Sequence, residues 1–559
     1  MVAERTASDQ RASREEDTMS DHGLTRRDVL KAGVTLAAAH LAAGTPASAQ
    51  TPRRGGVFRI SVGDPSHFDP HLTVGWSTHI ALSFTHSRLL KHKAGPAVTP
   101  GTFPIEGDLA ESWAQPSDTT YVFKLRRGVR WHPKPPVGGR ELTAEDVKYS
   151  FERFLGPTNN PNRAVLEEID KVEALDRYTV RFTLKAPYAW FLDAVASTVA
   201  WIVAREAVEQ HGDLKRPEAC IGTGPWMLER YEPNVRLVWT RHPDYFVSGL
   251  PYADGVEAAM EGDASARLAR WLGGHFDFAP SLGMVVRRLD LDVVRKRKPG
   301  LQTAEFLWMV GAFAAMKVDQ EPFKDVRARR ALFMASNLKE ILDANPIALG
   351  QGKPNPAVPA ALIDWSIPID QLTLAGQRLY EHDPKAAARL LADAGYPSGI
   401  KVPFETGSFG SDWMDGVQVY LRDWKAAGID AELKIKESGA FVSSAMLGKF
   451  DRLMLGMRGG VLFPDPYLAS FHLPGLRTNS SGVDDPKLTE MIRLERRTLD
   501  PSRRRDLVWD IQRYLAEQAY YFYGPSARVV AAWEAHVRNF APNLGNDYGG
   551  RLMAAWLDR

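Results

Sequence analysis

One short stretch of the sequence places a guanidinium beside two glycines. Residues 456–467 read GMRGGVLFPDPY. The guanidinium of Arg458 offers a planar fork of N–H donors that suits a carboxylate or a phosphate, and Gly459 and Gly460 leave room for a ligand to approach the backbone. This combination predicts a pocket in which Arg458 binds the anionic group of a small organic molecule. The alternative is that Arg458 pairs with a carboxylate of the protein and only shapes the pocket.

Aromatic side chains supply further candidates for the walls of such a pocket. We expect Trp76, Trp413, Phe463 and Tyr523 to line it, because aromatic side chains present a large apolar face to an organic ligand. Ordinary core packing is the alternative for each, since the chain contains 15 tryptophans.

Two Asp-Pro pairs predict turns near the same pocket. The pair at residues 69–70 predicts a turn that presents residues 72–76 to a cleft, with Val74, Gly75 and Trp76 as candidate ligand contacts. Asp465 precedes Pro466, and this pair also favours the start of a turn. We therefore expect the Asp465 carboxylate to cap a turn, with direct contact to a ligand as the second choice.

Side chains that could do catalytic or metal chemistry are not arranged for it. The sequence contains no HExxH, nucleophile-elbow, P-loop or dinucleotide-binding motif. His67, Asp69 and His71 would share one face of an extended segment, but two prolines interrupt that segment and no further metal ligand is identifiable. Cys220 is the only cysteine, which excludes an internal disulfide and a cysteine metal cluster. We predict no catalytic residue, metal or cofactor; a hydrolase built on two carboxylates is the remotest alternative.

Length, composition and charge set the broad class of the protein. A chain of 559 residues, 44% apolar and 25% charged, is typical of a globular protein with two to four domains. The net charge of +2 is too small to indicate a nucleic-acid partner.

The first fifty residues have the pattern of an export signal. Residues 25–31 read TRRDVLK, an alanine-rich apolar run follows at 32–43, and residues 47–49 read ASA. The pattern resembles a twin-arginine signal peptide with cleavage before Gln50, which predicts a periplasmic protein. The alternative is an amphipathic helix at the N-terminus. Met19 is an alternative start, because residues 1–18 fit no part of a signal peptide.

Strands and helices alternate along the rest of the chain. Residues 121–126 and 178–184 alternate apolar and polar side chains, as half-buried strands do. Thr143 stands three residues before Asp146 and predicts a capped helix whose apolar face continues to Leu155. Further helices are predicted at 384–395, 417–428 and 501–515, and the apolar segments at 306–314 and 519–530 predict strands.

Several motifs within these elements resemble one protein family. The segments LAESW at 109–113, YVFKLRRGVRWH at 121–132, LTAEDVKYSFER at 142–153 and GTGPW at 222–226 resemble the signature of bacterial extracellular solute-binding proteins of family 5, the oligopeptide-, dipeptide- and nickel-binding group. The resemblance covers most of residues 55–540. It implies an α/β fold in which two lobes close like a clamp around a ligand, with an additional subdomain inserted in the first lobe.

The resemblance also implies where the lobes begin and end. After the signal peptide at 1–49, we expect lobe I at 50–78, the inserted subdomain at 79–216, a second segment of lobe I at 217–305, lobe II at 306–523 and a C-terminal segment of lobe I at 524–559.

The function implied is solute capture for an ABC importer. The closed protein would deliver a peptide or other small organic solute to a permease in the inner membrane, and we expect it to act as a monomer without nucleic acid. In peptide-binding members, an aspartate in the segment corresponding to 456–467 pairs with the peptide's α-ammonium. That position falls on Gly460 or Leu462, and neither is acidic. The ligand stays open among peptide, opine, sugar, metal chelate and other solutes; a sensor or chaperone with the same clamp is the alternative.

Overall fold

The computed structural model describes residues 51–99, 101–542 and 545–559. The predicted signal peptide and Gln50 lie outside the described residues. Residues 53–559 form one compact unit, and the architecture below is that of this unit. No helix among the described residues is long and apolar enough to cross a membrane.

Lobe I is built around a four-stranded sheet in the order β1-β10-β9-β8. Strand β1 is parallel to β10, and the other neighbours are antiparallel. A second sheet has the order β11-β19-β12, with β14 paired to β19. The bounds are β1 Val57–Ser61, β8 Trp226–Glu232, β9 Arg236–Arg241, β10 Gly255–Ala259, β11 Val285–Val286, β12 Gln302–Leu307, β14 Gly352–Lys353 and β19 Ser526–Trp533.

Helix α2 (Trp76–Thr85) belongs to the core of lobe I. Its residues Leu82 and Phe84 are fully buried together with Trp226 and Trp239 of the first sheet. Most of the helix lies beyond residue 79, the predicted start of the inserted subdomain. The boundary therefore lies later in the chain, because the buried face of α2 packs on the lobe I sheet.

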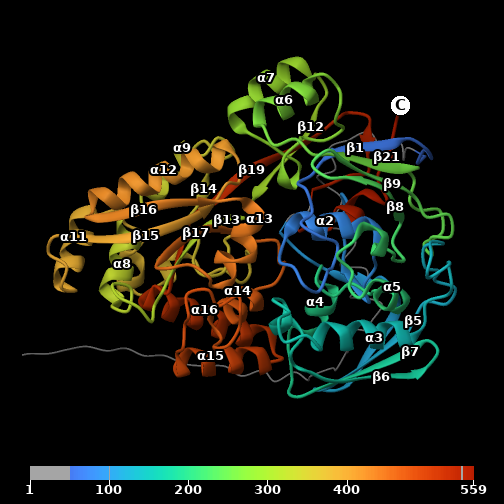
Figure 1. The fold of residues 1–559 in the computed structure, drawn as a ribbon, viewed down its shortest axis with the longest axis horizontal. Coiled ribbons are helices and arrows are strands. Elements are labelled where there is room, and N and C mark those ends of the chain that lie inside the picture. Colours follow the sequence, from blue (N-terminus) through green and yellow to red (C-terminus); the bar gives the residue numbers. More distant parts are fainter. Residues whose placement is uncertain (1–50, 100, 543–544) are drawn as a thin grey trace, which may run out of the picture. The chain divides into compact units, whose positions relative to one another are not determined.

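The inserted subdomain has a sheet and a hydrophobic core of its own (Figure 1). Its antiparallel sheet has the order β4-β5-β7-β6, and Tyr121 of β5 pairs with Phe182 of β7. The predicted capping box forms at helix α3, where Thr143 and Asp146 cap each other's backbone N–H groups. The bounds are β4 Ala110–Ser117, β5 Thr120–Leu125, α3 Ala144–Leu155, β6 Ile169–Asp176, β7 Thr179–Leu184, α4 Phe191–Ala196 and α5 Arg205–His211.

Lobe II contains a five-stranded sheet in the order β16-β15-β17-β13-β18. Strands β16 and β17 are parallel to β15, while β13 is antiparallel to both β17 and β18. The carboxyl ends of β15, β16, β17 and β18 therefore meet at one edge of the sheet. The bounds are β13 Gly311–Met316, β15 Ile400–Gly407, β16 Ile429–Lys436, β17 Leu453–Arg458 and β18 Tyr521–Tyr523.

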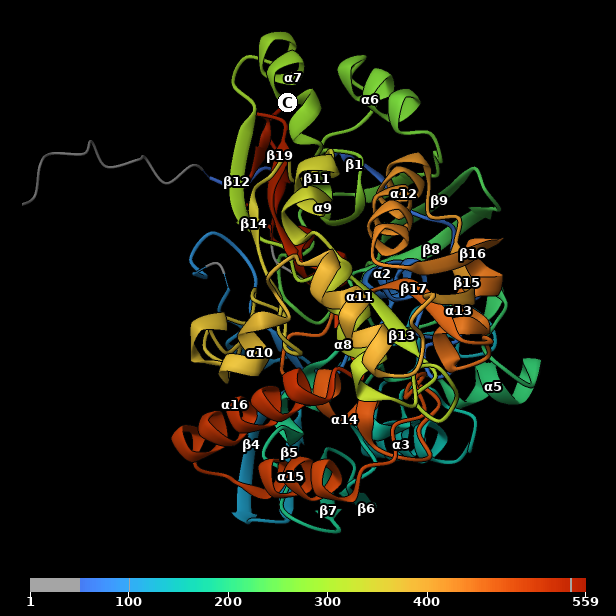
Figure 2. The same cartoon turned by 90° about the vertical axis from the view of Figure 1, so that its left-hand side faces the viewer.

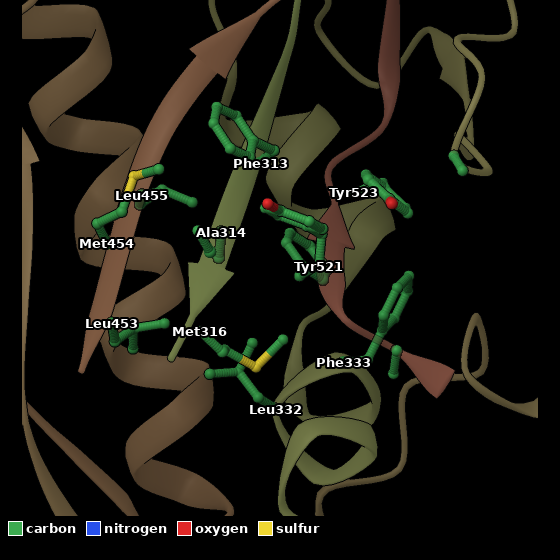
Figure 3. Close-up of a cluster of buried hydrophobic side chains, with 14 of the residues drawn as sticks. Phe313, Ala314, Met316, Leu332, Phe333, Leu453, Met454, Leu455, Tyr521 and Tyr523 are labelled. Atoms are coloured by element: carbon green, nitrogen blue, oxygen red, sulfur yellow. The ribbon is translucent and has the colours of Figure 1, made fainter. Parts of the chain in front are cut away.

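Helices pack on this sheet and form the largest hydrophobic core of the protein (Figure 2). Figure 3 shows part of that core, where side chains from β13, β17, β18 and α8 meet. The helices of lobe II are α8 Val326–Ala335, α9 Leu338–Ala344, α10 Leu374–Arg378, α11 Pro384–Asp393, α12 Ser411–Ala426, α13 Ser438–Ser443, α14 Asp465–His472, α15 Pro486–Arg497 and α16 Pro501–Gln518.

The remaining elements are short. They are the strands β2 Leu90–His92, β3 Ile105–Gly107, β20 Val537–Arg538 and β21 Trp556–Leu557, and the helices α6 Ala264–Leu272, α7 Leu291–Arg297 and α17 Tyr548–Leu552. The chain passes from the lobe I sheets to the lobe II sheet between β12 and β13 and returns between β18 and β19, and β14, which lies between α9 and α10 of lobe II, also pairs with β19. Separate cores in the two lobes and in the insert confirm the predicted two-lobed α/β fold with an inserted subdomain.

Candidate functional site

A cavity of about 1340 Å³ is lined by residues of both lobes. Lobe I contributes the residues that follow β1 and β10, at 62–66 and 261–262. Lobe II contributes the residues that follow β15, β16 and β17, at 408–413, 437–439 and 459–462. Ligands of open α/β sheets bind outside the carboxyl ends of the strands, and this cavity has that position in both lobes.

Seven of the ten predicted ligand-binding residues line this cavity. From lobe I they are the residues at the start of α2, and from lobe II they are a tryptophan in the first turn of α12 and the end of β17. The seven are Val74, Gly75, Trp76, Trp413, Arg458, Gly459 and Gly460.

The other three predicted residues lie outside the cavity lining. Phe463 packs in the core of the insert, with its ring 6.0 Å from that of Trp190. Tyr523 lies on β18 behind Arg458, covering the guanidinium at 4.1 Å. Asp465 is the first residue of α14 and is fully buried beside Arg496, 3.0 Å away. The carboxylate of Asp465 faces the insert, because the helix turns that side away from the cavity.

Arg458 is the last residue of β17 and is only 5% exposed. Its Nη2 donates a hydrogen bond of 3.3 Å to the carbonyl oxygen of Pro356. Its Nη1 is buried and has no hydrogen-bond partner among the described residues. No carboxylate of the described part of the chain lies within ion-pair distance of the guanidinium. The alternative in which Arg458 pairs with a protein carboxylate is therefore wrong for this structure.

Burial governs the electrostatics of Arg458. Removal from water lowers the pKa of the guanidinium from its usual value, and the surrounding tyrosines oppose this shift. The rings of Tyr523 and Tyr467 lie 4.1 and 5.4 Å from its central carbon, so the cation is held between aromatic faces. A buried cation with an unused N–H group can bind the anionic group of a ligand.

The two glycines after Arg458 serve the packing of the protein chain. Gly459 has φ +150°, and a Cβ atom there would lie 2.9 Å from the carbonyl oxygen of Met309. Gly460 has φ +85°, and a Cβ atom there would lie 2.9 Å from the side chain of Asn546. Protein atoms thus fill the space that the sequence predicts the glycines to leave for a ligand.

Every carboxylate that lines the cavity is already bound by protein donors. Asp64 accepts hydrogen bonds from Tyr231 and the Asn234 backbone, and Glu437 accepts from the backbone at the start of α13. Asp547 pairs with Arg88, Asp412 pairs with Arg287 and Glu261 accepts from the Asp263 backbone. The cavity therefore offers an anion a guanidinium that is only partly satisfied, and each of its carboxylates already has at least one donor from the protein.

More aromatic residues line the cavity than the sequence indicated. Six further aromatic residues face the cavity from both lobes, namely Trp308, Phe409, Tyr420, Tyr467, Phe471 and Tyr548. The hydroxyl of Tyr420 is buried and has no hydrogen-bond partner within the described residues. A position after a parallel strand was the available signal for Phe409. Trp308 follows β12, and the other four lie on helix faces that local patterns do not orient.

The residues considered as a metal site belong to a buried network instead. Asp69 pairs with Arg153 at 2.5 Å, and His71 contacts both Arg153 and the carbonyl oxygen of Trp201. Burial and the neighbouring guanidinium lower the pKa of His71 to about 3, so its imidazole is neutral. This network joins α3 of the insert to the segment that precedes α2.

The sequence is similar to those of proteins named for peptide binding. It is 29% identical over 490 residues to di/tripeptide-binding protein 1 of Pseudomonas aeruginosa, covering 82% of this chain and 86% of that protein. It is 26% identical over 527 residues to the dipeptide-binding protein of Escherichia coli, covering 89% of this chain and 92% of that protein.

Solved structures share the fold. The periplasmic binding protein DppA of Helicobacter pylori, in complex with the peptide STSA, superimposes with a TM-score of 0.78 at 23% identity, over 91% of this chain and 99% of that chain. The binding protein AgaA of Agrobacterium tumefaciens R10, in complex with agropinic acid, does so with a TM-score of 0.77 at 22% identity, over 90% and 99%.

The family assignment comes from the sequence profile of the central region. Residues 104–477, most of the chain, match the profile described as bacterial extracellular solute-binding proteins, family 5 middle. This match spans the insert, the second part of lobe I and most of lobe II, including the lobe II side of the cavity. The protein therefore belongs to the bacterial extracellular solute-binding proteins of family 5.

Proposed function

We propose that this solute-binding protein serves an ABC importer by capturing a small organic anion between its lobes, with Arg458 holding the anionic group. The observation that carries the proposal is the burial of Arg458 without a carboxylate partner among the described residues. An unpaired buried charge is costly, so the closed cavity favours a ligand that supplies the missing negative charge.

The bonds that the cavity carboxylates make to the protein narrow the chemical class of the ligand. A peptide bound through its α-ammonium needs an acidic partner. Each of the five carboxylates of the cavity already has a hydrogen bond or ion pair with the protein, whereas Arg458 has no carboxylate partner among the described residues. An organic acid, or a short or modified peptide bound through its carboxylate, fits the cavity better. The relatives named for di- and tripeptides and the structural neighbour that contains agropinic acid are consistent with this range.

Delivery requires export and a membrane partner. We propose that residues 1–49 act as a twin-arginine signal peptide and that the mature monomer works in the periplasm. Closure of the lobes over the ligand would present a surface to the permease subunits of the importer. The role is binding and release, without catalysis.

Native mass spectrometry of the protein purified from its own periplasm would identify the co-purifying ligand. Isothermal titration with that compound should then compare the parent protein with Arg458→Met, which retains much of the side-chain volume. We expect a loss of at least about 2 kcal/mol, roughly thirtyfold in affinity, because a buried charge-assisted contact is removed. Arg497→Ala, an exposed arginine of α15, is the control and should bind like the parent. Tight binding of unmodified di- or tripeptides that does not depend on Arg458 would overturn the proposal.

A further inference from the structure

The insert contacts lobe II through a buried polar cluster on the far side of Asp465. The hydroxyl of Tyr188 donates to Asp465 at 2.7 Å, and the indole N–H of Trp190 donates to Glu495 at 2.7 Å. Arg496 lies beside Asp465, 3.0 Å away. All five side chains are at most 3% exposed. We call these five residues the insert latch.

Arg496 also ties the latch to the backbone of the insert. Its carbonyl oxygen accepts the Ala189 N–H at 2.8 Å, and its guanidinium donates to the carbonyl oxygen of Ala164 at 2.8 Å. The same guanidinium lies 2.8 Å from Glu167. The contact between the insert and lobe II is therefore made of directional polar bonds that any separation must break together.

The insert itself is fastened to lobe I. Arg153 of α3 pairs with Asp69, and the His132 ring contacts the carbonyl oxygen of Gly224 at 3.1 Å. A clamp motion that separates lobe II from lobe I would carry the insert with lobe I. Opening the cavity would therefore open the insert latch, and closing it would form the latch again.

The insert latch contains two buried carboxylates, those of Asp465 and Glu495, but only one cation, Arg496. Arg496 serves Asp465 and also lies beside Glu167 and Glu168, at 2.8 and 3.7 Å. Glu495 is fully buried and makes no ion pair among the described residues. One of its oxygens accepts the Trp190 N–H, and the other has no hydrogen-bond partner in the described part of the chain. Burying a carboxylate in such a place costs less free energy when it is protonated than when it is ionised.

The contacts of the two buried carboxylates indicate that Glu495, rather than Asp465, is the protonated one. Asp465 accepts from Tyr188 and lies 3.0 Å from Arg496, whereas Glu495 accepts only from Trp190 and has no ion pair; one oxygen of each carboxylate lacks a hydrogen bond among the described residues. Burial, reinforced by the negative charge of Asp465, raises the pKa of Glu495 to about 8. The charged groups that act on Glu495 are Asp465, Arg496 and Arg504 of lobe II. Around them lie further titratable groups: Glu167, Glu168 and Tyr188 of the insert interact with Asp465 and Arg496, and Asp193 of the insert and Asp500 of lobe II interact with Arg504.

We propose that the insert latch closes with the uptake of one proton by Glu495, so that clamp closure is coupled to the pH of the periplasm. In the open form Glu495 would face water, with its pKa near 4.3. Closure is therefore most favourable at low pH. Its equilibrium constant falls by up to tenfold per pH unit as the pH rises toward about 8, where it levels off. The proposal rests on the clamp motion of the proposed function.

Hydrogen exchange of the Ala189 amide measures this opening without a ligand. The amide donates to Arg496 across the latch, so it exchanges when the latch opens. In the full mature chain, corrected for intrinsic exchange rates, its protection should fall between pH 5.5 and 8 by up to tenfold per unit. In Glu495→Gln, which keeps an acceptor for Trp190, protection should not depend on pH.

Two controls make the result decisive. Peptides from β15 (Ile400–Gly407), inside the lobe II sheet, report global unfolding and should show no matching change. Asp193→Asn removes a neighbouring carboxylate whose pKa burial raises to about 7, and this variant should keep the slope of the parent. A parent protein without a slope, a Glu495→Gln protein with the parental slope, or loss of the slope in Asp193→Asn would each overturn the proposal. Because no ligand is used, failure of anion binding at Arg458 leaves this test intact.

Discussion

The guanidinium of Arg287 lies 3.2 Å from the carboxylate of Asp412, and the two residues come from different lobes. Arg287 follows β11 of lobe I, where it also pairs with Asp290, and Asp412 lies in the first turn of α12 in lobe II. Both line the cavity. The ion pair thus joins the two lobes at the cavity and should stabilise only the closed arrangement, in which the lobes are together.

Replacing Asp412 with asparagine should weaken binding of the co-purified ligand. The pair is partly exposed, at 17% and 29%, so we expect a loss of at most about 1 kcal/mol, or two- to fivefold in affinity. Isothermal titration checks this. Asp343→Asn breaks an exposed pair with Lys339 inside α9 and serves as the matched control. Equal affinities of the two variants would show that the bridge does not assist closure.

Ligand binding should make the protein more compact. The crossings between the lobes beside β13 and β18 are the segments about which the lobes would rotate. Small-angle scattering should give a smaller radius of gyration when the co-purified ligand is added. At a hundredfold excess over its dissociation constant, the ligand should also stabilise the fold by about 2.7 kcal/mol. An unchanged radius with calorimetrically proven binding would speak against hinge closure.

Gly222 should not tolerate a side chain. A Cβ atom at this position would lie 1.9 Å from the carbonyl oxygen of Thr85, a backbone atom that cannot move aside. Gly222→Ala should lower the free energy of unfolding by about 2–4 kcal/mol, measured by urea denaturation. Gly416→Ala is the contrast, because open space surrounds the position that its Cβ atom would take on α12, and it should stabilise by about 0.5–1 kcal/mol. Similar midpoints for both variants would contradict the packing argument.

Acid should destabilise the fold through buried imidazoles such as that of His86. Burial lowers the pKa of His86 to about 3. The unfolded chain binds a proton near pH 6.5 and the folded chain does not, so the free energy of unfolding falls as the pH drops below 6.5. At pH 5 the loss from this residue is about 2 kcal/mol. Urea denaturation at pH 7 and pH 5 should show that the free energy of unfolding lost on acidification is smaller by that amount in His86→Gln than in the parent protein. His382→Gln, at an exposed site, should behave like the parent; a parental loss in His86→Gln would refute the assignment.

Export should depend on the arginine pair of the N-terminal segment. Replacing Arg26 and Arg27 with lysine should leave unprocessed precursor in the cytoplasm, because the twin-arginine pathway requires both guanidinium groups. Immunoblots of periplasmic and cytoplasmic fractions measure the effect. Unchanged yield of processed protein in the periplasm would exclude this route.

Much of the local structure follows from neighbouring residues alone. The capping box of Thr143 and Asp146 starts α3 as its spacing predicts, and Asp383 caps α11 with Pro384 at its first position. The alternation of residues 121–126 corresponds to β5, whose partner β7 contains the second predicted strand. The caps and the alternation depend on residues that are close in the sequence, so the sequence by itself determined them, as it determined the family motifs and the cation at position 458.

The tertiary structure decided what each candidate side chain touches. Asp465 bonds to Tyr188, 277 residues away, and so belongs to the insert latch although it follows the segment that lines the cavity. The glycines after Arg458 meet the backbone of Met309 and the side chain of Asn546, which local sequence does not reveal. The burial of Arg458 without a carboxylate in the described part of the chain is likewise a property of the assembled fold. Burial and pairing depend on which distant segments meet, and periodicity records only which face of an element is apolar.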